Sequence, residues 1–468
     1  MRMRVLVIVL LAAAAAAAQA PPSPGAVRTM RLDYFHTGDA KQELFSFDEA
    51  VVEPAAWSGH PARAADPLNY GAYGFDVRDA ASKTLLYSRG FGSIFDEWST
   101  TEEATTITKT FHESVRFPVP ASPVTVTIRK RTEKGWRDVW SVNVEPGNMF
   151  VNTAAPEPAP GALIAFEKNG DPATKVDLLL LGDGYTAAER RKFEADSRRL
   201  LAVLFSTSPF KERRRDFNVW GLVPAAKESG ISRPSGGVHR SNPISSTYDA
   251  FGSERYVLAF DNKAFRRHAS YAPYDVVEIV VNGRTYGGGG IYGLYSTVAA
   301  DNAFAPYVFV HEFGHHFAAL ADEYYTSPVA YLPSATRDEP WEPNVTALRD
   351  PNTLKWKDLV KPGTALPTPW PKDAYETASR ESQARRARLR ADKRPEAEME
   401  ALFAEERRRD DVMFATSSGM VGAFEGARYE AKGFYRPEAN CIMFTRADFF
   451  CAVCRRALEQ VIDTYSRK

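Results

Sequence analysis

The chain has 468 residues, 44% hydrophobic and 12% aromatic, which is enough for two or three domains with full cores and excludes a disordered protein. Its 59 basic residues equal its 59 acidic residues, so the composition gives no reason to expect nucleic acid or an acidic membrane as a partner.

The first twenty residues have the pattern of a secretory signal peptide. Arg2 and Arg4 precede an apolar run over residues 5–18, and the small-residue sequence Ala18-Gln19-Ala20 ends it. This run is shorter than the about 20 apolar residues that a membrane-spanning helix needs. We therefore expect cleavage after Ala20, a secreted or otherwise extracytoplasmic protein, and no stable membrane insertion afterwards.

Residues 27–150 carry short segments in which apolar and polar side chains alternate. The clearest are "VTVTIRK" at 124–130 and "VWSVNV" at 139–144. Alternation with period two and no long apolar helix predicts an antiparallel β-sandwich domain. The Pro-rich stretch "APEPAPGA" at 155–162 then predicts a domain boundary.

Residues 163–468 are expected to form a second domain of a different kind. Continuous apolar runs at 176–181, 217–223 and 276–281 predict strands buried on both faces. Thr186 and Glu189 fit a capping box that opens a helix, and a further helix is expected over residues 306–320. The predicted fold class is therefore α+β, with an amino-terminal antiparallel β-sandwich followed by an α/β domain built on a mixed sheet.

A charged segment at about 375–412 interrupts the second domain. It is rich in Ala, Arg and Glu and changes from basic to acidic at Pro395. We interpret it as an inserted pair of helices, either simply solvated or serving as a substrate-recognition lid.

The stretch "HEFGHH" at 311–316 holds three of the chain's eight histidines. On a helix, residues four apart lie about 40° apart, so His311 and His315 project from one face and can chelate one ion. His316 points about 140° away from His311, which favours a packing or surface role. Glu312 lies about 100° from His311, within reach of a water on that ion.

These residue types suit zinc chemistry. Neutral imidazoles bind zinc, and three protein ligands leave a fourth position for a water whose pKa the ion lowers to about 7. A carboxylate beside that water can take its proton during attack on a peptide carbonyl. The spacing therefore predicts Glu312 as general base.

Exclusion narrows the candidates for the third metal ligand. No histidine follows His316, so the candidates are Asp322, Glu323 or the upstream His239 and His268. In a continuing helix Asp322 would lie about 16 Å along the axis from His311. If a carboxylate is the ligand, the chain must therefore turn back near residues 318–320.

With these residues in view, the chain resembles the IgA-peptidase family of zinc metallopeptidases, a metzincin-like group with an amino-terminal β domain. The resemblance rests on "LLLLGDGYTAAE" at 178–189, "FNVWGLVPAAKESG" at 217–230, "HEFGHHFAALADEYY" at 311–325, and "GFYRPEANCIMF" followed by "FCAVC". It implies a metzincin-like zinc-peptidase domain with one zinc ion per chain, held by His311, His315 and Asp322, and Glu312 as catalytic base.

The resemblance also suggests that Met443 belongs to a turn beneath the zinc, although Met443 taken alone could be plain core. The chain departs from the wider metzincin pattern because alanine, at 318 or 319, stands where a glycine is expected at the bend, and because the acid comes one residue late.

Three further features have more than one interpretation. The run "NGRTYGGGGIYG" at 282–293 could be an edge strand that pairs with a substrate or a flexible turn. Tyr429 or Tyr435 could donate a hydrogen bond to the oxyanion of the reaction, or be structural. The three cysteines, Cys441, Cys451 and Cys454, are expected to form one disulfide rather than a metal site, because a structural zinc normally needs four ligands and no histidine lies nearby.

The leading hypothesis is a secreted zinc metalloendopeptidase that hydrolyses protein or peptide substrates. The alternative is a secreted binding or adhesion protein whose metal site is structural or silent. A zinc hydrolase acting on cell-wall peptide would share the same site.

Overall fold

The computed structural model describes residues 27–333 and 336–466. The predicted signal peptide, residues 1–20, lies outside the described residues. Among the described residues, no helix combines the length and the apolar character that crossing a membrane requires.

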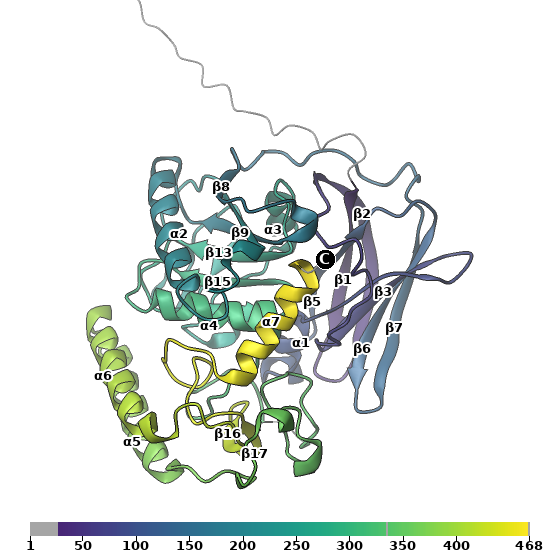
Figure 1. Cartoon of the computed structure of the whole chain (residues 1–468). Helices are drawn as coiled ribbons and strands as arrows, with labels where there is room; N and C mark the ends of the chain where they lie inside the picture. The colour runs from purple at the N-terminus through teal and green to yellow at the C-terminus, as the bar shows by residue number, and fades with distance from the viewer. Residues whose placement is uncertain (1–26, 334–335, 467–468) are drawn as a thin grey trace, which may run out of the picture.

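The N-terminal region is an antiparallel β-sandwich (Figure 1). Val124, Val126 and Ile128 point into its core and are fully buried, which confirms the alternation read from the sequence. One sheet has the order β2-β1-β5 and the other β4-β3-β6-β7. The strands are β1 (Arg28–Gly38), β2 (Glu43–Ala56), β3 (Tyr73–Asp79), β4 (Leu85–Phe91), β5 (Lys109–Pro118), β6 (Val124–Thr132) and β7 (Gly135–Val144).

A mixed six-stranded sheet organises the rest of the chain, as the sequence predicted. Its order is β14-β15-β13-β9-β10-β8; the four central strands are parallel, and β14 and β8 run antiparallel at the two edges. The strands are β8 (Ile164–Glu167), β9 (Val176–Asp183), β10 (Phe217–Leu222), β13 (Val276–Val281), β14 (Gly288–Ile291) and β15 (Tyr295–Ala299).

Both faces of this sheet are covered, which explains why its central strands are apolar throughout. Leu178 and Leu180 of β9 face a core shared with α2 (Arg190–Leu204), α4 (Ala305–Ala318) and α7 (Ala452–Ser466). Leu179 and Leu181 face the opposite core, which α3 (Asn262–Ala269) covers. The predicted capping box of Thr186 and Glu189 is present, on a short 3-10 turn that leads into α2.

The remaining elements lie around this layered region. They are α1 (Ile94–Ser99), which joins β4 to β5, the hairpins β11 (Ser246–Thr247) with β12 (Leu258–Ala259) and β16 (Phe424–Ala427) with β17 (Glu430–Arg436), and the helices α5 (Lys372–Ala391) and α6 (Glu396–Phe414). The charged segment is thus a pair of helices, which project at one side of the sheet (Figure 1).

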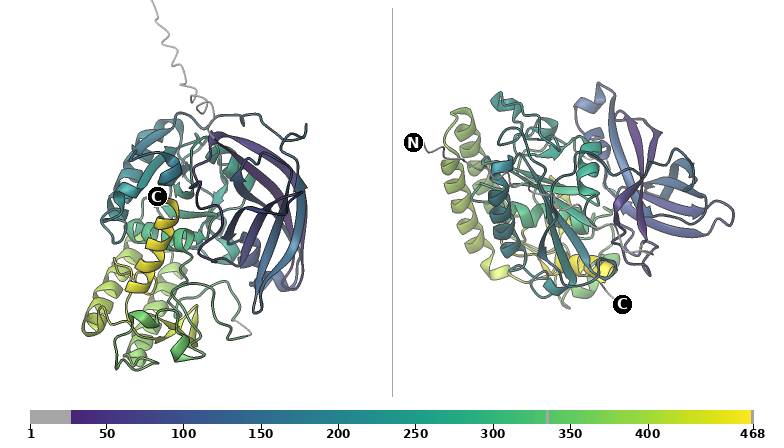
Figure 2. Two further views of the ribbon diagram at one scale, coloured as in Figure 1. Left: turned by 45° about the vertical axis from the view of Figure 1, so that its right-hand side comes forward. Right: turned by 90° about the horizontal axis from the view of Figure 1, so that it is seen from above.

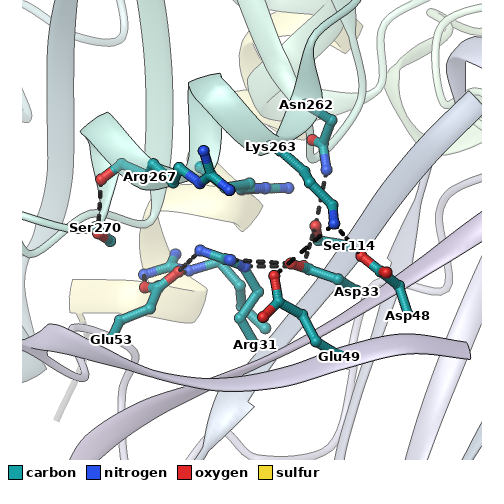
Figure 3. A network of polar contacts seen from close by, with 12 residues as sticks. Arg31, Asp33, Asp48, Glu49, Glu53, Ser114, Asn262, Lys263, Arg267 and Ser270 are labelled. Carbon is teal, nitrogen blue, oxygen red and sulfur yellow. Dashed lines mark hydrogen bonds and ion pairs between the residues drawn. The ribbon is translucent and has the colours of Figure 1, made fainter. Parts of the chain in front are cut away.

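The sandwich packs beside the layered region (Figure 2) through a polar network centred on α3 (Figure 3). Asn262 donates to Ser114 at 2.8 Å and Lys263 pairs with Asp48 at 2.5 Å. Arg116 bonds both Glu53, at 2.8 Å, and the Tyr274 carbonyl, at 3.0 Å. Through these contacts Asn262 and Lys263 of α3, together with the Tyr274 carbonyl, join the layered region to the sandwich.

Candidate metal centre

The helix α4 carries the "HEFGHH" stretch and ends where the sequence requires a turn. Its last residue is Ala318, and Ala319 takes the left-handed conformation with φ 56°. That position is usually glycine because a Cβ is crowded there. Alanine nevertheless makes the bend, and the chain returns so that Asp322 lies against His311 and His315.

Three ligand atoms converge at this bend. The Nε2 atoms of His311 and His315 lie 3.2 Å apart, and Oδ1 of Asp322 lies 3.2 Å from the first and 3.3 Å from the second. A tetrahedral zinc site with bonds of 2.0–2.1 Å has edges of about 3.3–3.4 Å between its ligand atoms. The three atoms therefore match three corners of such a site.

Both histidines are oriented by backbone carbonyls. Nδ1 of His311 lies 2.9 Å from the carbonyl oxygen of Ile442, and Nδ1 of His315 hydrogen-bonds the carbonyl oxygen of Leu320. A carbonyl only accepts, so each Nδ1 carries the proton and each Nε2 keeps its lone pair for a cation.

Asp322 supports the same assignment from its own contacts. The Tyr429 hydroxyl donates to its Oδ2 at 2.6 Å, while its buried Oδ1 has no hydrogen-bond partner among the described residues. A buried carboxylate oxygen without a donor is costly unless a cation satisfies it. The donor set of two imidazoles and one carboxylate is one that zinc accepts.

Glu312 lies beside these atoms without belonging to the tight triad. A carboxylate oxygen of Glu312 lies within 4.8 Å of a ring nitrogen of His311 and of His315, but among the described residues Glu312 forms no ion pair with either, whereas Asp322 pairs with both at 3.2–3.3 Å. We therefore place Asp322, rather than Glu312, with the histidines. Burial raises the pKa of Glu312 above its usual value, although the two histidines oppose that shift.

The charges of the triad are strongly coupled. Burial lowers the pKa of His315, but the Asp322 carboxylate outweighs it and raises that pKa to about 9. Burial raises the pKa of Asp322, and the two histidines outweigh it and hold that pKa well below its usual range. The site thus favours the ionised form of the Asp322 carboxylate next to positive charge.

His316 lies on the other side of α4, as its angle on the helix predicted. It is buried between Val277, whose N–H donates to Nε2, and Ile291, whose carbonyl accepts from Nδ1. Burial lowers its pKa to about 3, so it is a neutral packing residue.

The triad opens onto a cleft of about 730 Å³ that lies between the sandwich and the sheet region. The N-terminal region supplies one wall through Glu97 and Thr100 of the α1 segment, and β14 supplies another through Gly288 and Gly290. None of the described residues of α5 or α6 lines this cleft. The charged helices instead pack beside the start of α4, where the ring of Phe403 lies against Phe304.

Comparison with protein families gives two matches that together span most of the chain. Residues 164–462 match the IgA Peptidase M64 family, and residues 25–140 match the Peptidase M64 N-terminus. The chain belongs to the IgA peptidase M64 family. M64 peptidases are metallopeptidases, so the chain is a peptidase and the resemblance inferred from its motifs is confirmed. A search of curated proteins found no match.

Some residues that the sequence offered as candidates lie away from the triad of this M64 peptidase. His239 is exposed on a loop, and His268 lies on α3, across the sheet from α4. Glu323 points away from the cleft and contacts Asn344 and Cys454. These placements leave Asp322 as the carboxylate that meets the two histidines.

Two ambiguous features take a definite form in the structure. The glycine run contains the edge strand β14, so its centre is a strand and not a flexible turn. Met443 is fully buried beneath α4, with its sulfur 3.2 Å from the position that a Cβ on Gly314 would occupy. Met443 therefore lies beneath α4, against the turn of the helix that carries His311 and His315.

Several polar residues around the cleft were not predicted from the sequence. Arg255 donates to the Tyr324 hydroxyl at 3.1 Å, and both line the cleft. Glu97 accepts hydrogen bonds from Tyr256 and Tyr331, and burial raises its pKa to about 7. Of these residues, Tyr324 lies two positions after Asp322, and that closeness in sequence could have marked it as a residue of the site.

Proposed function

We propose that this M64 peptidase is a zinc-dependent metalloendopeptidase in which His311, His315 and Asp322 hold the ion and Glu312 is the general base. The observation that carries the proposal is the spacing of the three ligand atoms, 3.2–3.3 Å on every side. Bound zinc supplies a Lewis acid that lowers the pKa of water and polarises a peptide carbonyl.

The chain's own residues supply the proton transfer and the positioning. Glu312 takes the proton of the attacking water on its carboxylate and returns it to the leaving amide nitrogen. Tyr429 holds the Asp322 carboxylate in place through Oδ2.

The edge strand β14 offers a place for an extended substrate. All four residues of β14 pair with β15, and the outer edge of Gly288 is already bonded to Arg255 and Val257, so a substrate would pair with this edge from Gly290 onward, where it lines the cleft. A peptide that adds to this edge as a strand would lie beside Glu312, because Gly290 packs directly on that residue. Binding through the substrate backbone suits cleavage within a chain.

The decisive experiment compares Glu312→Ala with the parent in peptide cleavage and in metal content by plasma mass spectrometry. We expect one zinc ion per chain at this centre in both proteins, and a loss of turnover of about 10²–10⁴-fold in the variant. Glu381→Ala, which changes an exposed glutamate on α5, is the control and should cleave like the parent. Near-parental cleavage by Glu312→Ala would refute the mechanism.

We also propose that the protein is exported and that its mature chain begins after Ala20. The support is the sequence alone, with two arginines, a short apolar run and a small-residue cleavage pattern. Amino-terminal sequencing of the protein made by its own cells tests this proposal, and a retained Met1 would contradict it.

A further inference from the structure

A second cluster of metal-binding side chains lies in the core behind the candidate metal centre. Cys441 comes from the turn after β17, Cys451 and Cys454 from the start of α7, and Glu323 from the segment that follows α4. All four are buried, with exposed fractions of 0–1%. One ligand atom from each lies within 4.8 Å of all the others.

The structure does not contain the disulfide that the sequence analysis expected. All three cysteines are free, and the Sγ atoms of Cys441 and Cys454 lie 3.9 Å apart, against about 2.0 Å for a disulfide bond. A tetrahedral zinc with bonds of about 2.3 Å to sulfur places two sulfurs about 3.8 Å apart. The separation therefore suits two sulfurs that share one ion.

Glu323 is a fourth candidate ligand beside the three cysteines, and it was not predicted from the sequence. Its Oε1 lies 3.3 Å from Sγ of Cys454, and a zinc ion bound by one sulfur and one oxygen separates them by about 3.5 Å. Asn344 donates to the same Oε1 at 2.9 Å and so orients the carboxylate. The other oxygen, Oε2, is buried and has no hydrogen-bond partner among the described residues.

Backbone donors point at two of the sulfurs. The N–H of Cys454 lies 3.4 Å from Sγ of Cys451, and the N–H of Cys451 lies 3.3 Å from Sγ of Cys441. Sulfur accepts such bonds best as a thiolate, because an ionised acceptor makes the stronger hydrogen bond. Cysteine is a metal ligand in the same thiolate form.

We propose that Cys441, Cys451, Cys454 and Glu323 form a structural zinc site, separate from the catalytic centre. Three thiolates and a carboxylate fill four positions and leave none for a substrate, as in structural zinc sites. Thiolate-rich sites select soft or borderline ions such as zinc over magnesium or calcium.

The position of this site gives it a role in shaping the catalytic centre. Glu323 follows Asp322 directly, and its N–H donates to the carbonyl of Met443 at 2.8 Å. The carbonyl of the neighbouring Ile442 accepts from His311. An ion between Glu323 and Cys441 therefore fixes both the segment that presents Asp322 and the turn that orients His311.

The test measures zinc per chain by plasma mass spectrometry in the full-length mature protein and in three variants. We expect about two zinc ions in the parent and about one each in His315→Ala and Cys454→Ser, which lose different ions. Val453→Ala is the control: it removes a buried side chain between two of the cysteines but no ligand, and should keep both ions.

Cobalt substitution identifies the ligands of each ion. In His315→Ala loaded with cobalt, a sulfur-to-cobalt charge-transfer absorption should remain, whereas Cys454→Ser should lack it. A third measurement uses the parent alone. The protein is unfolded with a chelator and no reductant, its thiols are alkylated, and the modified cysteines per chain are counted. Three modified cysteines support the proposal, whereas one modified cysteine together with a disulfide overturns it.

The zinc measurements distinguish failure of the structural-site proposal from failure of the catalytic proposal. One zinc in the parent that His315→Ala loses would overturn the structural site and leave the catalytic proposal intact. One zinc that Cys454→Ser loses and His315→Ala keeps would uphold the structural site and refute the catalytic one.

Discussion

The Tyr429 hydroxyl donates a 2.6 Å hydrogen bond to Oδ2 of Asp322, across 107 positions of sequence. This bond leaves Oδ1 as the oxygen that faces His311 and His315. Tyr429 thereby positions the Asp322 carboxylate against the two histidines. From the sequence, Tyr429 or Tyr435 could donate to the oxyanion or be structural; the hydroxyl of Tyr429 is bonded to the Asp322 carboxylate.

Replacing Tyr429 by phenylalanine should weaken metal binding without unfolding the protein. Loss of a group that orients a ligand typically costs 10–100-fold in affinity, and we expect a zinc affinity about 10–100-fold lower in Tyr429→Phe. Competition with a chromogenic chelator measures it. Tyr435→Phe, on the same hairpin but outside the cleft lining, is the control; equal affinities in the two variants would contradict the role of Tyr429.

Much of the centre could be predicted because its geometry is local. The helical period alone places His311 and His315 together and turns His316 into the core, where Val277 and Ile291 bond it. The reach of a helix likewise shows that the chain must bend before Asp322, and it bends at Ala319.

The features that the sequence could not reveal depend on contacts between distant segments. Glu323 meets Cys454 across 131 positions, and without that contact three cysteines near the end of the chain suggest a disulfide. Arg255 and Glu97 reach the cleft only because the sheet edge and the sandwich meet there. Periodicity describes each segment but not which segments become neighbours.

The bend at Ala319 leads to a stability prediction. The left-handed conformation costs an alanine about 1–2 kcal/mol of strain in the folded protein. Glycine avoids that strain, but its greater conformational freedom stabilises the unfolded chain by about 0.4–1 kcal/mol. Ala319→Gly should therefore raise the free energy of unfolding by up to about 1 kcal/mol and keep the metal. Chemical denaturation measures it.

The neighbouring alanine provides the matched control. Ala318 is the last residue of α4 and has ordinary helical geometry, so Ala318→Gly should lower the free energy of unfolding, by up to about 1 kcal/mol. Equal effects of the two substitutions would show that the left-handed residue carries no strain.

The glycines of β14 are needed because the strand lies directly against α4. A Cβ on Gly290 would lie 2.4 Å from the carbonyl oxygen of Glu312 and 3.0 Å from Cβ of His315. Gly290→Ala should therefore push the strand off the helix, at a cost of about 1–3 kcal/mol in stability. Since the displacement involves Glu312, kcat/KM should fall by up to about 100-fold.

Gly147→Ala is the control for this substitution, because a Cβ there has no heavy atom within 4 Å. Denaturation curves and peptide cleavage should be unchanged in Gly147→Ala. A Gly290→Ala protein with parental stability and activity would show that β14 can move away from the helix at no cost.

Two neighbouring carboxyl groups at the start of the sheet, those of Asp177 and Asp275, predict how stability varies with pH. Burial, reinforced by the neighbouring Asp275, raises the pKa of Asp177 to about 8, and burial raises that of Asp275 to about 7, against about 3.8 for the ordinary side chain. The folded protein thus holds protons that the unfolded chain releases above pH 4. Their contribution to stability is complete below pH 4 and is lost as pH rises toward 7–8.

Asp177→Asn should flatten that dependence, since an amide does not titrate. Between pH 5 and pH 8 the parent should lose more unfolding free energy than the variant, by up to about 1.4 kcal/mol per pH unit for one titrating group. Urea denaturation at both pH values measures the difference. Asp79→Asn is the control, because the pKa of the half-buried Asp79, lowered to about 2 by hydrogen bonds from Ser122 and Ser82, lies below this range. An unchanged slope in Asp177→Asn would mean that Asp177 is already ionised at pH 5 in the folded protein.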